Sequence, residues 1–226
     1  MKKFSAVLLV IIMLFSLSAC GKFNQKKLVG TWETELLIND FITDEFDALD
    51  MPDDVLNKFK KLNFKMRITY KEDGTCDNYY EQKSFDKLWE DYIDIIIDYY
   101  KNGGLVELYK QQGADINSQQ ELEAILTTLG TDFETTINTT KDALKIVVDG
   151  IKAKIISETK AENGYYKINS KPEKYSVKEN VITIINDNDK KELMYFKLID
   201  KNTIEITKMI VDYEEVDAKP TFKRVK

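Results

Sequence analysis

The apolar residues of this chain change their spacing twice, and this change of period limits the folds that the chain can adopt. Between Phe64 and Tyr70 every second residue is apolar, which is the pattern of a strand with one buried face. The turn residues Glu72-Asp73-Gly74 follow, and residues 75–82 predict a return strand. An early β-hairpin is therefore expected.

From residue 85 to about residue 159 the period becomes helical. Ser118 with Glu121, and Thr131 with Glu134, have the spacing of capping boxes, and they predict helices over 119–129 and 132–157. The triplet Asn102-Gly103-Gly104 should interrupt the first helix of this block. That helix carries apolar residues at three- and four-residue steps, namely Phe85, Leu88, Trp89, Tyr92, Ile95, Ile96 and Tyr99.

Strand patterns return after Gly164. Short apolar segments separated by turn residues occupy 165–169, 174–178, 181–186, 192–199, 203–211 and 221–225. With the first strand at 33–38 and the hairpin, these segments total about nine closely spaced strands. We expect an α+β fold: an antiparallel β-barrel of about eight to nine strands within residues 28–226, interrupted by a helical insertion at about 85–160.

The N-terminus has the organisation of a secretion signal. A basic start, Met1 to Lys3, precedes an apolar run from Phe4 to Leu17 that is shorter than the roughly 20 apolar residues of a membrane-spanning helix. This pattern predicts a signal peptide over residues 1–19. An N-terminal membrane span is the alternative interpretation.

The residues Leu17-Ser18-Ala19-Cys20 resemble the lipobox of bacterial lipoproteins. The resemblance implies cleavage before Cys20, diacylglycerol and palmitate on this lipid-attachment residue, and a lipidated tether over residues 20–27. The protein would then be anchored to the cell membrane on its extracytoplasmic face. A plain signal peptide with an incidental cysteine remains the alternative.

The amino-acid composition excludes several kinds of catalytic and binding site. The chain contains no histidine, so catalytic triads with a histidine base and histidine-ligated zinc sites are excluded. If Cys20 carries lipid, Cys76 has no partner for an intrachain disulfide. The formal net charge of −6 argues against nucleic acid as a partner. We therefore expect no catalytic residues, no metal site and no cofactor, and a protein that is not an enzyme.

The aromatic residues Trp89, Tyr92 and Tyr99 allow two interpretations. They could pack as core against the sheet, which is the usual role of aromatic residues on an amphipathic helix. They could instead form an exposed apolar surface for a partner or for lipid. The core interpretation is the stronger, and the interaction surface is kept as the alternative.

Gly30-Thr31-Trp32 on the first strand resembles the Gly-x-Trp signature of lipocalins and other calycins. In that family a basic residue on the last strand packs over the Trp, and Arg224 is in the matching position. The chain is similar to small lipocalin-like lipoproteins of Gram-positive bacteria, although the long helical block departs from the lipocalin pattern. The resemblance implies a barrel with Trp32 closing one end.

Two function hypotheses follow. The leading one is a non-enzymatic, membrane-anchored lipoprotein that binds a small hydrophobic ligand, because a barrel of about eight strands can enclose one such molecule. The alternative is an envelope protein-interaction scaffold whose helical insertion docks a partner. The polarity of the barrel interior and the exposure of the insert's aromatic residues would discriminate between them.

Overall fold

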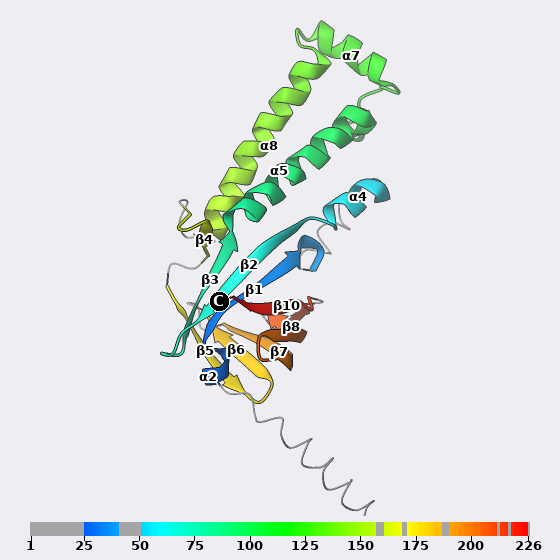
Figure 1. Cartoon of the computed structure of the whole chain (residues 1–226). Coiled ribbons are helices and arrows are strands. Elements are labelled where there is room, and N and C mark those ends of the chain that lie inside the picture. Colours follow the sequence, from blue (N-terminus) through cyan, green and yellow to red (C-terminus); the bar gives the residue numbers. More distant parts are fainter. Residues whose placement is uncertain are drawn as a thin grey trace, which may run out of the picture.

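The structure is a computed structural model, and it describes residues 25–40, 51–156, 161–168, 171–186, 190–211, 213–216 and 218–225. A β-barrel forms one part of the molecule, and a long helical arm projects from one end of it (Figure 1). The expected α+β fold, an antiparallel barrel with a helical insertion, is confirmed. Leu17, Ser18, Ala19 and Cys20 lie outside the described residues, so the lipid anchor stays a prediction.

Eight of the described strands close the barrel. Each is antiparallel to its neighbours, and β10 pairs with both β1 and β8, which completes the ring. In ring order the strands are β1 (Gly30–Leu37), β2 (Asn63–Tyr70), β3 (Thr75–Glu81), β5 (Glu173–Lys178), β6 (Val181–Ile185), β7 (Lys191–Asp200), β8 (Thr203–Val211) and β10 (Thr221–Val225).

Two further strands lie outside the ring. β4 (Tyr165–Lys167) pairs with β3, and β9 (Glu214–Val216) pairs with β8. The sequence pattern predicts β4 but not β9, because three residues with two acids show no apolar alternation. The predicted hairpin of β2 and β3 is confirmed, and its turn uses Gly74 at φ +84° while Asp73 accepts a hydrogen bond from the Thr75 backbone at 2.9 Å.

The predicted helical insertion runs between β3 and β4. Its helices are α5 (Gln82–Tyr99), a distorted turn η2 (Tyr100–Gly104), α6 (Leu105–Gln111), α7 (Gln119–Thr128) and α8 (Phe133–Ile155). Outside the insertion lie α2 (Gln25–Leu28), the 3-10 turn η1 (Ile38–Asp40) and α4 (Asp53–Phe59). α2 begins inside the segment that the sequence predicts as a tether.

Local signals explain where the insertion's helices begin and bend. Ser118 caps α7 by accepting a hydrogen bond from the Glu121 backbone at 3.2 Å, as predicted. The predicted cap of α8 is wrong by one residue: Asp132, not Thr131, accepts from the Thr135 backbone at 2.7 Å. The break after α5 is confirmed, since Gly103 has φ +106°.

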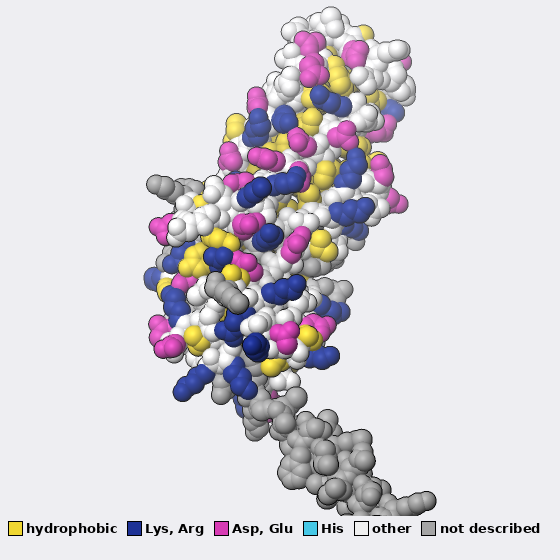
Figure 2. Space-filling model, viewed as in Figure 1, with side chains coloured by type: hydrophobic (Ala, Val, Ile, Leu, Met, Phe, Trp, Pro, Cys, Tyr) yellow, Lys and Arg dark blue, Asp and Glu magenta, His cyan; other side chains and the backbone are white. Residues whose placement is uncertain are grey.

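α5 and α8 leave the barrel side by side, and α7 lies at the far tip of the arm (Figure 1). The arm has a core of its own, which includes the buried residues Ile93, Leu122 and Ile137. Lys, Asp and Glu side chains are interspersed over its surface (Figure 2). None of the described helices has the length and apolarity needed to cross a membrane.

Candidate functional site

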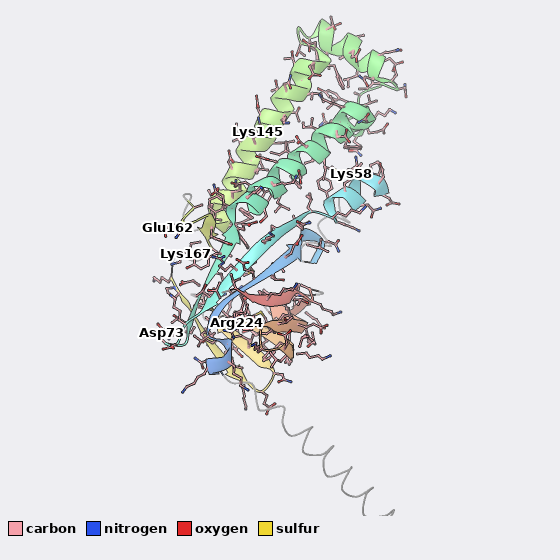
Figure 3. The ribbon with its side chains drawn as sticks, viewed as in Figure 1. Lys58, Asp73, Lys145, Glu162, Lys167 and Arg224 are labelled. Carbon is pink, nitrogen blue, oxygen red and sulfur yellow. The ribbon has the colours of Figure 1, made fainter. Side chains whose placement is uncertain are left out.

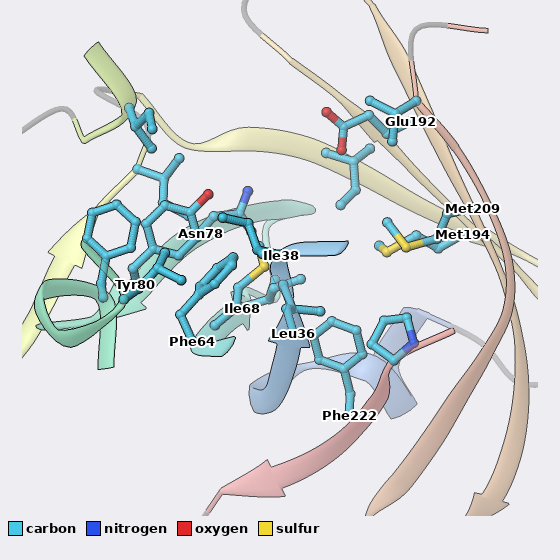
Figure 4. A pocket seen from close by; sticks show the side chains of 18 of the residues that line it. Leu36, Ile38, Phe64, Ile68, Asn78, Tyr80, Glu192, Met194, Met209 and Phe222 are labelled. Atoms are coloured by element: carbon cyan, nitrogen blue, oxygen red, sulfur yellow. The ribbon is translucent and has the colours of Figure 1, made fainter. Parts of the chain in front are cut away.

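The barrel is hollow at the end from which the arm projects. A cavity of ≈ 580 Å³ lies there, enclosed by strand residues and by the base of the arm (Figure 4). This volume falls within the range of about 300–1,000 Å³ that is usual for small-molecule sites. Its strand walls are mainly aliphatic, thioether and aromatic, with Ile68, Ile184, Met194, Met209 and Phe222 among them.

Strand alternation places these side chains in the interior. Ile68 and Met194 each face inward while the residues beside them in the chain face outward, because consecutive side chains of a strand point to opposite faces. Met194 lies opposite Met209 in the pairing of β7 with β8. Flexible thioether side chains adapt to irregular shapes, so this wall can fit apolar groups of varied outline.

The opposite end of the barrel is filled. The residues Leu28, Trp32, Tyr70, Ile204, Ile206 and Phe222 leave only ≈ 10 Å³ there. We call this the closed end, and we call the hollow part with its ≈ 580 Å³ cavity the open end. A ligand of ordinary size has room only at the open end.

The closed end brings together the three signature residues. The guanidinium carbon of Arg224 lies 4.3 Å from the centroid of the Trp32 ring, and Arg224 Nη1 donates to the Val29 carbonyl at 2.6 Å. Trp32 is fully buried, and its Nε1 donates to the Leu28 carbonyl at 2.7 Å. Gly30 has φ +124°, and a Cβ there would come within 2.8 Å of Arg224 Nη1. Figure 3 labels Arg224 on the barrel, away from the arm.

Polar groups form a small patch inside the otherwise apolar open end. Asn78 on β3 and Glu173 on β5 are both 8% exposed, and Asn78 Nδ2 donates to Glu173 Oε2 at 2.7 Å. Asn78 Oδ1 is buried and has no hydrogen-bond partner among the described residues. Glu192 on β7 lines the same cavity, and in Figure 4 its carboxylate points from the strand toward the side on which Asn78 and Tyr80 lie.

Burial and the nearby acidic side chains raise the pKa of two neighbouring groups. Burial first, then Glu173, Asp77 and Glu192, raise the pKa of the Cys76 thiol to about 12. Burial, with a contribution from Glu192, raises the pKa of Tyr80 to about 12. Both groups therefore stay protonated and neutral at physiological pH. Cys76 is fully buried, so the thiol serves as a small core residue rather than as a nucleophile.

The base of the arm covers the cavity. Phe85, Leu88 and Trp89 from α5 and Ile151 and Ile155 from α8 contribute to the lining. This cover is fastened at its rim: Lys152 Nζ lies 2.5 Å from Asp86 Oδ1, and the Tyr166 hydroxyl donates to Asp86 Oδ2 at 3.0 Å. These contacts tie α8, α5 and β4 together beside the cavity.

Trp89, Tyr92 and Tyr99 of the insert are half-buried. Tyr92 packs against Phe59 of α4 at a ring separation of 5.2 Å, and Trp89 packs edge-on against Phe85 at 6.0 Å. The ring centroids of Tyr99 and Tyr100 are 5.7 Å apart, and Tyr99 packs against the core cluster that contains Phe59 and Phe85. Trp89 Nε1 is buried without a hydrogen-bond partner in the described part of the chain. Trp89, Tyr92 and Tyr99 therefore contribute mainly to packing.

Exposed apolar side chains of the arm occur elsewhere. On α8, Ile146 is 74% exposed and Val147 is 57% exposed, and Leu129 after α7 is 71% exposed.

The sequence reasoning missed Asn78, Glu173 and Glu192. Each is a polar residue at an inward position of a strand, which is the signal that could have identified it. Reading that signal requires the strand phase, and the predicted strands did not fix this phase. Asp77, next to Asn78, faces the other way and pairs with Lys71 at 2.5 Å.

Within the described ranges, no group of three or more Asp, Glu or Cys side chains is placed to hold a metal ion. The described acids Asp53 and Asp54 lie in the first turn of α4. The open end thus combines an apolar enclosure with a few polar side chains, a combination that is common in small-molecule sites.

No protein-family model matches this chain, and no curated protein matches it either. The case for its function therefore rests on the geometry of the barrel and on the sequence patterns.

Proposed function

We propose that the protein is a lipocalin-like lipoprotein that binds a small hydrophobic ligand in the cavity at the open end of its barrel. The observation that carries this proposal is the ≈ 580 Å³ cavity, walled by apolar side chains and covered by the base of the arm. When an apolar molecule replaces water in such a cavity, the burial of apolar surface favours binding by about 25 cal/mol per Å².

The proposed cellular context comes from the N-terminus. The Leu17-Ser18-Ala19-Cys20 pattern supports a lipid anchor on Cys20, which would hold the barrel at the extracytoplasmic face of the cell membrane. Two acyl chains, each contributing about 0.8 kcal/mol per buried methylene, would make the anchorage stable. Hydrophobic molecules of the envelope would then be within reach of the cavity.

Native mass spectrometry tests the binding proposal. The chain from Gly21 to Lys226 retains every contact that closes the barrel, because all eight ring strands lie between Gly30 and Val225. Purified from bacteria without detergent, it should carry an additional mass that is lost on denaturation. A clean ligand-free mass that persists after incubation with an envelope lipid extract would remove the proposal.

A matched pair of variants assigns the bound mass to the cavity. Met209→Trp puts an indole into the open end and should abolish the additional mass. Leu198→Trp makes a similar change at an exposed position of β7 that does not line the cavity, and should leave the mass unchanged. Equal loss in both variants would place the ligand elsewhere.

The anchor has its own test. Cys20→Ser removes the thiol that would be alkylated, so the variant should take up no labelled palmitate and should be released from the membrane fraction. Cys76→Ser is the control, since Cys76 is buried in the barrel and should not affect labelling. Palmitate incorporated into the Cys20→Ser variant would contradict the assignment.

A second candidate function is the docking of an envelope protein on the arm. It is favoured by the exposure of Ile146 and Val147, neighbouring apolar side chains on α8. A partner that co-purifies with the protein should be lost in the double variant Ile146→Glu, Val147→Glu and retained in Met209→Trp. The reverse pattern would assign the interaction to the barrel instead.

A further inference from the structure

The polar lining of the open end has a definite chemical character. Among the lining residues that the structure describes, two are acidic, Glu173 and Glu192, and none is Lys or Arg. One N–H of the Asn78 carboxamide donates to Glu173, while its acceptor, Oδ1, has no hydrogen-bond partner among the described residues. The strand side of the patch thus presents oxygen acceptors.

A buried acceptor without a partner is unfavourable, because the group has lost its hydrogen bonds to water. Asn78 is more than nine-tenths buried, and its open Oδ1 belongs to a residue that lines the cavity. A ligand that donates a hydrogen bond here would satisfy this atom. A ligand that brings another acceptor would leave it unsatisfied.

Charge acts in the same direction. An anionic head group entering the cavity would meet the carboxylates of Glu173 and Glu192 in a low-dielectric interior, where like charges repel strongly. A primary ammonium carries three donors and one positive charge, so it can bond to Asn78 Oδ1 while it is attracted to both carboxylates. Burial is the first cause of the raised pKa of neighbouring Cys76, and Glu173, Asp77 and Glu192 raise this pKa further.

The donors in the lining lie on other residues. The Tyr80 hydroxyl and the Trp89 Nε1 of α5 belong to the same cavity, and the Trp89 nitrogen has no partner among the described residues. They can accommodate a second polar atom of a ligand, but a neutral donor does not offset two acidic side chains. The walls formed by Met194 and Met209 suit an apolar chain or ring.

We propose that the cavity selects amphipathic amines, molecules with an apolar body and a protonated amino head group held by Asn78, Glu173 and Glu192, over fatty-acid anions of the same length. This inference rests on the proposed binding function and names the ligand class for it.

Three probes that differ only in their head group test the selectivity: dodecylamine, dodecan-1-ol and dodecanoate. Each probe competes with the neutral fluorophore N-phenyl-1-naphthylamine for binding to the chain from Gly21 to Lys226. The measurement is made at pH 7.5, with every probe below the concentration at which that probe aggregates. Dodecylamine should displace the fluorophore at a concentration at least tenfold lower than dodecanoate, with the alcohol between them. This comparison uses the native residues, so it does not depend on a variant that folds.

Two charge-removing variants locate the effect. Glu192→Gln should reduce the amine-to-acid preference at least threefold. Glu205→Gln removes an equal charge from β8 at a position outside the cavity lining and should preserve the preference. Glu173→Gln serves as a second cavity variant if Glu192→Gln does not fold, as judged by circular dichroism.

The outcomes separate this inference from the function on which it rests. Equal displacement by all three probes, or tighter binding of dodecanoate, would overturn the selectivity while leaving the cavity as a binding site. An amine preference that neither Glu192→Gln nor Glu173→Gln changes would overturn the assigned residues. Failure of the fluorophore and of all three probes to bind would overturn the proposed binding function itself.

Discussion

The two ends of the barrel are built from the same eight strands, yet one is packed and the other is hollow. At the closed end Trp32, Phe222 and Ile206 leave a void of ≈ 10 Å³. At the open end the cavity reaches ≈ 580 Å³ and contains buried polar groups. The closed end therefore supplies stability, whereas the open end trades some packing for a space that can hold a ligand.

The two ends are also held in place by different contacts. The closed end is fixed by large side chains and by Arg224, whose hydrogen bonds to the Val29 and Lys27 carbonyls join the last strand to the start of the first. The open end is fixed by the arm, through Asp86, Lys152 and Tyr166.

The largest effect is expected for Trp32→Ala. Trp32 is fully buried at the closed end, so its removal should lower the free energy of unfolding by about 3–5 kcal/mol. Met209→Ala at the open end should cost about 1 kcal/mol or less, because the space it leaves joins an existing cavity. Urea unfolding of the ligand-free proteins measures both, and equal costs would show that the open end is packed as tightly as the closed end.

Substitutions that enlarge a side chain should also affect the two ends differently. Ile206→Phe forces extra volume into the packed closed end and should cost about 1–3 kcal/mol. Ile184→Phe makes the same change at the cavity wall and should alter the free energy of unfolding by less than about 1 kcal/mol. Thermal unfolding of the two variants tests this, and a greater loss in Ile184→Phe would contradict a hollow open end.

Arg224→Lys isolates the cap of the closed end. Lysine keeps the charge but loses the planar group that lies over the Trp32 ring and bonds to two carbonyls, so the variant should lose about 0.5–2 kcal/mol. Lys223→Gln, an exposed neighbour on β10, is the control and should be close to neutral. Denaturant midpoints at constant slope would measure the change, and a stable Arg224→Lys variant would make the cap dispensable.

The smallest effect is a pH dependence that originates at Cys76, which is buried opposite Tyr70 in the pairing of β2 with β3. The pKa of Cys76 is about 12 in the folded chain and 9.0 in the unfolded chain. Between these two pH values the unfolded chain therefore binds fewer protons than the folded chain. Stability should consequently fall as pH rises above 9, with a contribution of about 1 kcal/mol at pH 10. Cys76→Ala should remove this part of the decline between pH 8 and pH 10, and identical declines in both proteins would refute the assignment to Cys76.

Much of the fold could be predicted because the elements carry local signals. The alternation from Phe64 to Tyr70 follows from the pleat of a strand, and the Ser118 cap follows from the unpaired N–H groups at the start of a helix. The one-residue error at Asp132 has a local cause as well: Thr131 and Asp132 are both good caps, and only the backbone conformation selects between them.

The candidate site was less accessible to sequence reasoning. Asn78, Glu173 and Glu192 come from three strands that are separated by up to 114 positions along the chain, and nothing in their immediate neighbours marks them as inward-facing. Trp32 and Arg224 are still farther apart along the chain but could be paired, because the resemblance to lipocalins links them.

The sequence by itself determined most of the strand and helix segments of this protein, the break at Gly103 and the exclusion of histidine chemistry. These depend on backbone preferences and side-chain types, which act over a few residues. The pairing of Trp32 with Arg224 came only from the family resemblance. Only the tertiary structure decided that the other end is hollow, that the arm covers it and that three polar side chains converge inside it. A cavity is volume that no residue fills, and its existence depends on how distant strands close on one another rather than on any one segment.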